Sequence, residues 1–151
     1  MTTLKHEVED FYRTGMRLLM GSDLHGVRLL LAVAETVWMI TLIWPGDSFS
    51  RPTYQVMSMV MSEPAWALVF AMTSACQWSI LFSGKYHDRL AVIFAAWNST
   101  LWWFVVVCMY TSISPPPAAI SGEFSLAVGA SWVWMRSGYC FRLEEKNGKV
   151  Q

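Results

Sequence analysis

The stretch VRLLLAVAETVWMITLIW, residues 27–44, decides the fold of this chain. A hydrocarbon core about 30 Å thick is crossed by roughly 20 mostly apolar residues in a helix, because each residue rises about 1.5 Å. The stretch has that length and character, and Pro45 and Gly46 follow it directly, where they end a helix. The sequence therefore predicts a first membrane-spanning helix over residues 27–44.

Three further stretches have the same length and apolar character. They cover residues 64–83, 89–111 and 115–136, the last opening on three consecutive prolines. Only residues 84–88 join the second stretch to the third, which predicts an antiparallel hairpin. The predicted fold class is an all-α integral membrane protein, a bundle of four transmembrane helices with an N-terminal amphipathic interfacial helix.

Composition agrees with a membrane environment. Hydrophobic residues make up 54% of the chain and the mean hydropathy is +0.35, more than a soluble domain needs to fill its core. Lysine plus arginine and aspartate plus glutamate number 11 each, so the zero net charge gives no argument for nucleic acid. The lipid bilayer is the expected partner, and no nucleic acid is expected.

The orientation follows from the positive residues, because they gather on the cytoplasmic side of membrane proteins. With the N-terminus inside, ten of the eleven are cytoplasmic and only Arg51 is outside. The ten are Lys5, Arg13, Arg17, Arg28, Lys85, Arg89, Arg136, Arg142, Lys146 and Lys149. We therefore expect a multi-pass protein with both its N-terminus and its C-terminus in the cytoplasm.

The chain divides into three regions. Residues 1–22 carry apolar side chains at helical spacing with charged residues on other faces, which predicts an interfacial amphipathic helix. Residues 23–138 form the four-helix transmembrane domain. Residues 139–151 are a polar cytoplasmic tail, expected to be solvated.

Three polar residues fall at similar depth inside the predicted spans. A carboxylate within a bilayer costs several kcal/mol unless it is neutralised, paired or hydrated, so Glu35 needs compensation. Gln77 and Asn98 lie at about the same depth, counted at about 1.5 Å per residue from the cytoplasmic ends. This intramembrane polar cluster is interpreted either as a proton or cation site or as interhelical hydrogen bonding.

The fourth span carries two further features near its outer end. Glu123 is an outer-leaflet acid close to a helix N-terminus, either facing water or stabilised by the helix dipole. Ser121, Ser125 and Gly129 recur every four residues and predict a helix-packing row, which we call the small-residue row. Spacing alone leaves open whether the row packs within the chain or against a second copy.

No nucleophile elbow, phosphate loop or zinc-protease motif occurs, so we expect no enzyme. The three histidines lie outside the spans or at their edges, and the three cysteines form no CxxC pair. The sequence therefore predicts neither a metal site nor a cofactor.

Two resemblances bear on function. The blocks YRTGMRLLMGSDLHGVRLLLAVAE, PPPAAISGE and WVWMRSG resemble those of small multi-pass membrane proteins of tailed bacteriophages, which implies a bacterial inner (cytoplasmic) membrane and no established activity. AVAE, which contains Glu35, is similar to the first-helix carboxylate motif of small multidrug-resistance transporters, although the later pattern of that family is missing.

The leading hypothesis is a non-enzymatic inner-membrane protein that acts by assembly with itself as a homo-oligomer or by contact with a membrane-protein partner. A holin-like pore, an exclusion factor and an envelope factor are examples. The alternatives are a small proton-coupled transporter that uses Glu35 and a structural subunit of a larger membrane or virion complex.

Overall fold

The computed structural model describes residues 24–46, 48–83, 89–113 and 120–146, and within these ranges it contains helices and no strand. The long helices are α2 (Leu24–Ile43), α4 (Glu63–Ser83), α5 (Arg89–Ser112) and α6 (Ile120–Lys146). The predicted all-helical class is confirmed. The predicted interfacial helix over residues 1–22 lies outside the described residues.

Helices α2, α4 and α5 are each long and apolar enough to cross a membrane, judged by length and composition. They coincide with the first three predicted spans. Helix α6 does not belong to this group, because serines, glycines, tryptophans and Glu123 lower its apolar character. It also continues to Lys146, so the first part of the predicted polar tail is helical. No proline interrupts it there, and Arg142, Leu143 and Lys146 favour helix.

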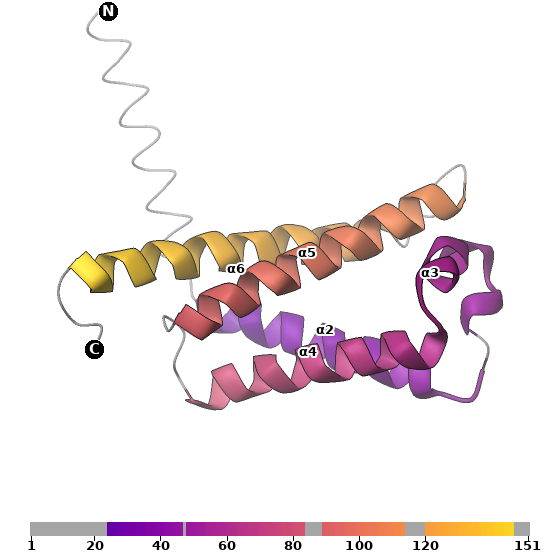
Figure 1. Ribbon diagram of the computed structural model, residues 1–151, viewed down its shortest axis with the longest axis horizontal. Helices are drawn as coiled ribbons and strands as arrows, with labels where there is room; N and C mark the ends of the chain where they lie inside the picture. The colour runs from indigo at the N-terminus through magenta and orange to yellow at the C-terminus, as the bar shows by residue number, and fades with distance from the viewer. Residues whose placement is uncertain (1–23, 47, 84–88, 114–119, 147–151) are drawn as a thin grey trace, which may run out of the picture.

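The four long helices form two layers (Figure 1). Helix α2 packs mainly against α4, and α5 packs mainly against α6, while α2 also meets α6. The consecutive helices α4 and α5, predicted as a hairpin, make few close backbone contacts with each other. Their five-residue connection holds two ends together, but it does not decide which faces pack.

Bulky aromatic side chains fill the space between the layers. The rings of Trp38 and Phe70 stack at a centroid distance of 5.1 Å, and Phe70 lies 5.8 Å from the ring of Trp102. Trp66 stacks on Phe104 at 5.9 Å. Aromatic rings of this size keep the backbones of α4 and α5 apart, whereas serine and alanine let the other pairs approach closely.

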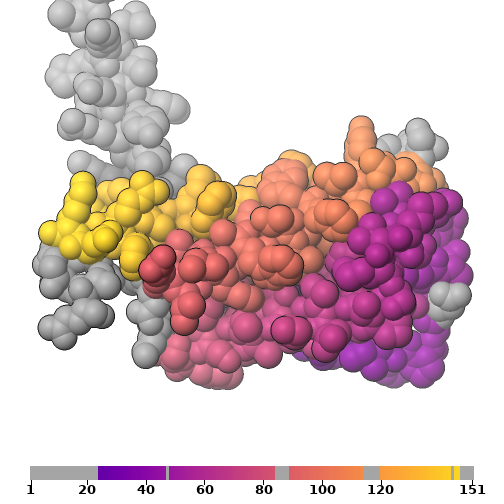
Figure 2. Space-filling view, in the orientation of Figure 1, coloured from indigo at the N-terminus to yellow at the C-terminus, as the bar shows by residue number. Residues whose placement is uncertain are grey.

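The linker between α2 and α4 covers one end of the bundle (Figure 2). It contains η1 (Ser48–Ser50), η2 (Pro52–Tyr54) and α3 (Gln55–Val60). The indole N–H of Trp66 donates to the Met57 carbonyl at 3.0 Å, and the Val56 N–H donates to the Ser112 hydroxyl at 3.2 Å. These bonds attach the linker to both layers.

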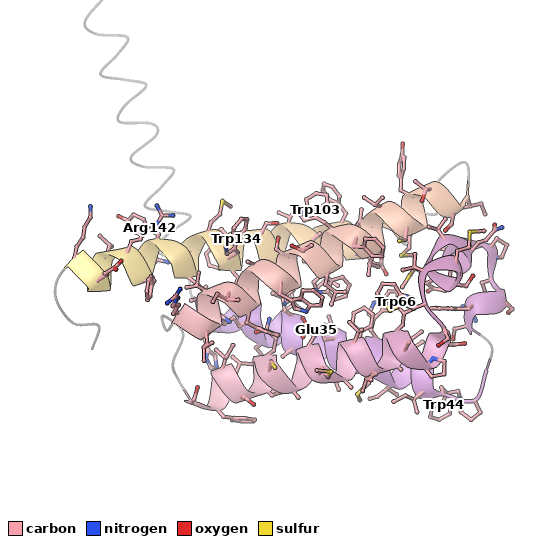
Figure 3. The ribbon with its side chains drawn as sticks, in the orientation of Figure 1. Glu35, Trp44, Trp66, Trp103, Trp134 and Arg142 are labelled. Atoms are coloured by element: carbon pink, nitrogen blue, oxygen red, sulfur yellow. The ribbon has the colours of Figure 1, made fainter. Side chains whose placement is uncertain are left out.

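Apolar side chains face outward along all four long helices. Glu35 lies between the layers, whereas Trp44, Trp103 and Trp134 lie at the surface (Figure 3). The exposed apolar set includes Leu30, Val37, Leu68, Met72, Ile93, Val107, Val128 and Met135. A helix bundle that is apolar on its outside and carries polar groups inside suits a lipid surrounding.

Candidate functional site

Among the described residues, both buried charged side chains lie on one face of α2. Arg28, Leu31, Ala32 and Glu35 are all buried, and their spacing of three, one and three residues places them on one helix face. Arg28 and Glu35 lie seven residues apart, about 10 Å along the axis. The buried polar groups therefore form two layers, which we call the Arg28 layer and the Glu35 layer.

The Arg28 layer joins three helices. The Arg28 side chain is fully buried, and its Nη1 donates to Gln77 Oε1 on α4 at 3.4 Å. Its Nη2 donates to the Ser137 hydroxyl on α6 at 2.8 Å. Gln77 and Ser137 are also fully buried. One guanidinium thus connects α2, α4 and α6, because its fork of donors can reach two acceptors at once.

The sequence predicts that Arg28 lies on the cytoplasmic side with nine other positive residues, and the structure adds that its side chain is buried. Helix α2 begins at Leu24, so Arg28 stands one turn inside the helix. An arginine this close to a helix end usually extends to the water. Here the amide of Gln77 and the hydroxyl of Ser137 offer acceptors in the interior instead.

The Glu35 layer consists of Glu35 on α2 and of Asn98 and Trp102 on α5. Each of the three is at most 1% exposed. The Asn98 amide and the Trp102 indole lie close enough to interact with the Glu35 carboxyl. Nevertheless, among the described residues, both Glu35 oxygens, both Asn98 side-chain polar atoms and the Trp102 nitrogen lack a partner of good hydrogen-bond geometry. Buried polar atoms in this state are costly, and this set is the most unusual feature of the interior.

The structure places all three residues of the predicted polar cluster in the interior but in different layers. Gln77 bonds to Arg28, whereas Asn98 is the neighbour of Glu35. Arg28 and Trp102 were not part of the predicted cluster. The spacing of Asn98 and Trp102, four residues apart on one helix face, is the signal that links Trp102 to the cluster.

Hydroxyl pairs connect the helices within each of the two close helix pairs, α2 with α4 and α5 with α6. The hydroxyls of Thr36 on α2 and Ser74 on α4 lie 2.7 Å apart, and the Trp78 indole donates to Thr36 at 3.2 Å. Ser131 on α6 lies 2.8 Å from the Ser99 hydroxyl and accepts from the Trp103 indole at 2.9 Å. Each such bond contributes on the order of 0.6 kcal/mol in a membrane bundle, so these pairs fix packing rather than chemistry.

The small-residue row divides into two parts. Ser121 and Ser125 are exposed, whereas Gly129 faces α2, where an added methyl group would lie 3.6 Å from Val27 Cγ1. The row therefore contacts α2 through its last residue and leaves its first two residues on the surface of the bundle.

The acid Glu123 is partly buried near the linker. Its Oε2 atom is buried without a hydrogen-bond partner in the described residues. Burial, and then the nearby Glu123 carboxylate, raise the pKa of Tyr54 above its ordinary value, while Arg51 acts in the opposite direction. Glu123 therefore lies within electrostatic reach of the linker rather than of the Glu35 layer.

The described part of the chain contains no group of three or more histidine, cysteine, aspartate or glutamate side chains that could hold a metal ion. Cys76, Cys108 and Cys140 are free thiols on three different helices. The interior thus offers a carboxyl, two amides, a guanidinium and an indole, all of which can form hydrogen bonds, and of these groups only the carboxyl can take up or release a proton. No protein-family model, curated protein or solved structure matches the chain.

Proposed function

We propose that this chain is a non-enzymatic protein of a bacterial inner membrane that acts by association within the bilayer. In this proposal α6 is a fourth span, residues 1–22 form an interfacial helix, and both termini are cytoplasmic. The partner is a second copy or another membrane protein, as for a holin-like pore, an exclusion factor or an envelope factor. The phage resemblance of the sequence supports this setting.

One observation carries the proposal: the polar side chains between the helices are buried, while the outward faces are largely apolar. Glu35, Asn98 and Trp102 are at most 1% exposed, and none of them lines the cavity found near the end of α2. The surface therefore offers a partner helix faces rather than a substrate site.

The exposed part of α6 supports association more specifically. Ser121, Gly122 and Ser125 are exposed, and a methyl group at Gly122 would meet nothing within 4 Å. Small residues let another backbone approach closely, which is how helices associate in lipid. A second copy or a partner helix would find its closest approach on this part of the surface.

A proton-coupled transporter that uses Glu35 is the second candidate. It is favoured by the unpartnered Glu35 oxygens, because an intramembrane acid with free hydrogen-bonding capacity is typical of a site that exchanges a proton. It is disfavoured by the absence of exposure at Glu35, because a transported proton must reach the carboxyl from water. A structural subunit of a larger complex is the third candidate.

Disulfide crosslinking tests association directly. In a chain without its three native cysteines, Ser125→Cys and Val107→Cys are oxidised in native membranes. Both positions are exposed: Ser125 lies five residues after the start of α6 and Val107 five residues before the end of α5. We expect Ser125→Cys to give a crosslinked dimer, or an adduct with a partner, in much higher yield than Val107→Cys. Equal or negligible yields at both positions would remove α6 as the association face.

Regulated expression in a bacterium separates the candidates. Growth and membrane potential are recorded together after induction. A pore is expected to cause an abrupt loss of membrane potential. In vesicles containing the purified chain, proton flux that is abolished by Glu35→Gln would favour the transporter. The association proposal would be overturned if crosslinking and depolarisation were both absent and proton flux depended on Glu35.

A further inference from the structure

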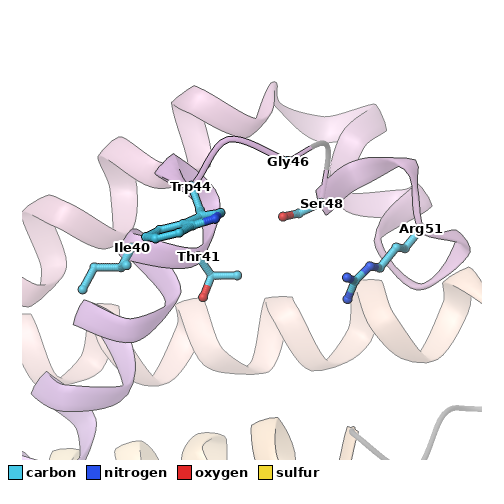
Figure 4. Close-up of a pocket in the computed structure, with 6 residues that line it drawn as sticks. All are labelled: Ile40, Thr41, Trp44, Gly46, Ser48 and Arg51. Carbon is cyan, nitrogen blue, oxygen red and sulfur yellow. The ribbon is translucent and has the colours of Figure 1, made fainter.

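A cavity of about 330 Å³ lies beside the C-terminal end of α2, away from the buried polar layers. Figure 4 shows Trp44, Thr41 and Ile40 on the α2 side and Ser48 and Arg51 on the linker side. Gly46 completes the lining, and because it has no side chain it leaves the cavity open on that side. Trp44 is 70% exposed, so the cavity opens to the surroundings of the protein.

Two donors in the cavity are uncommitted. Within the described residues, neither the Arg51 guanidinium nor the Ser48 hydroxyl is hydrogen-bonded or ion-paired to another side chain. The Thr41 hydroxyl, in contrast, donates to the Val37 carbonyl at 2.8 Å and presents its methyl group. A planar guanidinium beside a hydroxyl suits the oxygens of a phosphate group.

An apolar track leads away from the cavity along α2. Val33, Val37 and Ile40 are exposed and stand three or four residues apart, so they form one stripe that ends at the cavity. Trp44 directly follows the candidate span Leu24–Ile43, and tryptophan prefers the depth of lipid headgroups. In a bilayer crossed by α2, the apolar stripe would lie at the depth of the acyl chains and the cavity at the depth of the headgroups.

We propose that this cavity binds the phosphate of a phospholipid headgroup, with Arg51 and Ser48 as donors and an acyl chain along Val33, Val37 and Ile40. The Glu63 carboxylate accepts the Ser48 N–H at 3.2 Å, next to the cavity. An acid in that place favours a headgroup that carries an amine as well as a phosphate. The site requires that α2 lies in a bilayer, and it is independent of how the protein associates.

Photolabelling with one lipid tests the site. The full chain is placed in vesicles of phosphatidylethanolamine containing a small fraction of the same lipid with a photoactivatable headgroup, and adducts are mapped by mass spectrometry. We expect adducts to concentrate on residues 40–51. Arg51→Gln should lower them about tenfold, as expected for loss of one charge-assisted bond. Arg51→Lys, which keeps the charge, should retain most of the labelling.

The matched control is Arg89→Gln, which removes an exposed arginine at the opposite end of the bundle. It should leave labelling of residues 40–51 unchanged. Circular dichroism checks that each variant is folded. We expect Arg51→Gln to fold, because the hydrogen bond from the Arg51 backbone N–H to the Ser48 carbonyl does not depend on the side chain. Unchanged labelling in Arg51→Gln would overturn the site. Competition by inorganic phosphate would overturn the lipid as its occupant.

Discussion

Arg28 and Glu35 occupy the same buried face of α2, and each brings a group that water normally solvates into an apolar interior. Removing such groups from water costs several kcal/mol, which hydrogen bonds must offset. Arg28 donates hydrogen bonds to Gln77 and Ser137. Glu35 has polar neighbours in Asn98 and Trp102 but no well-formed bond, so its compensation is the weaker one.

Substitutions of Glu35 should separate a structural role from a titrating one. Glu35→Gln keeps the size of the side chain and offers both a donor and an acceptor to Asn98 and Trp102, so we expect nearly unchanged stability. Glu35→Leu removes the polar neighbour of Asn98 and Trp102, and we expect a cost of about 1 to 3 kcal/mol because their interaction with the carboxyl is lost. Thermal unfolding in detergent measures the difference.

The control for this pair is Val37→Leu, an apolar exchange at an exposed position two residues further along α2. It should unfold at the temperature of the unchanged chain. If Glu35→Leu is as stable as Val37→Leu, the Glu35 layer contributes nothing to folding. If Glu35→Gln is stably folded but no longer supports proton flux in vesicles, the transporter becomes the better explanation.

At the scale of helices, the two close pairs are joined by small residues and hydroxyls, while aromatic rings separate α4 from α5. The sequence predicted where α2, α4 and α5 run, because span length and apolar composition are local properties. It predicted a hairpin of α4 and α5, whereas the close pairs are α2 with α4 and α5 with α6. Helices α4 and α5 have no pronounced amphipathic stripe that would mark their buried sides.

The difference between local and tertiary information also decides what could be predicted of the interior. Glu35 and Asn98 were recognisable, because polar residues within apolar spans usually face the inside of a bundle. Arg28 was not, because a positive residue near a span end is ordinarily cytoplasmic. Its partners Gln77 and Ser137 lie 49 and 109 residues away in the chain, and only the tertiary structure brings them together.

Gly129 provides the prediction at this scale, because it is the member of the small-residue row that faces α2. A methyl group there would lie at ordinary contact distance, 3.6 Å from Val27, so Gly129→Ala should be tolerated. Gly129→Leu should push α2 and α6 apart and lower the free energy of unfolding by about 1 to 3 kcal/mol, the usual cost of overpacking. Val128→Leu, at an exposed neighbouring position, is the control. Equal unfolding temperatures for the two leucine variants would show that α2 does not need the small residue.

For the molecule as a whole, the decisive property is an apolar outside combined with an interior that holds buried polar groups. Such a distribution is stable in lipid, where the outward residues cost nothing, and it would be a severe aggregation hazard in water. The distribution of positive residues then predicts the direction of insertion. Both the proposed association and the proposed lipid site require that the helices cross a bilayer, so the membrane topology is the property to test first.

Cysteine labelling should place the linker outside and the end of α6 inside. In a chain without native cysteines, Ser58→Cys and Lys146→Cys replace two exposed residues, one on α3 and one at the end of α6. We expect an impermeant maleimide to modify Ser58→Cys in intact cells and Lys146→Cys only after lysis. The reason is that the reverse orientation would move ten positive residues to the outer side.

The pair also tests whether α6 is a span. Helices α4, α5 and α6 separate the two positions, so three crossings place them on opposite sides of the membrane, whereas two crossings place them on the same side. Labelling of both cysteines in intact cells would therefore show that α6 does not cross, and labelling of Lys146→Cys alone would show that the orientation is reversed. Equal reaction of both variants in detergent is the necessary control, because it shows that both thiols are chemically accessible once the bilayer is removed.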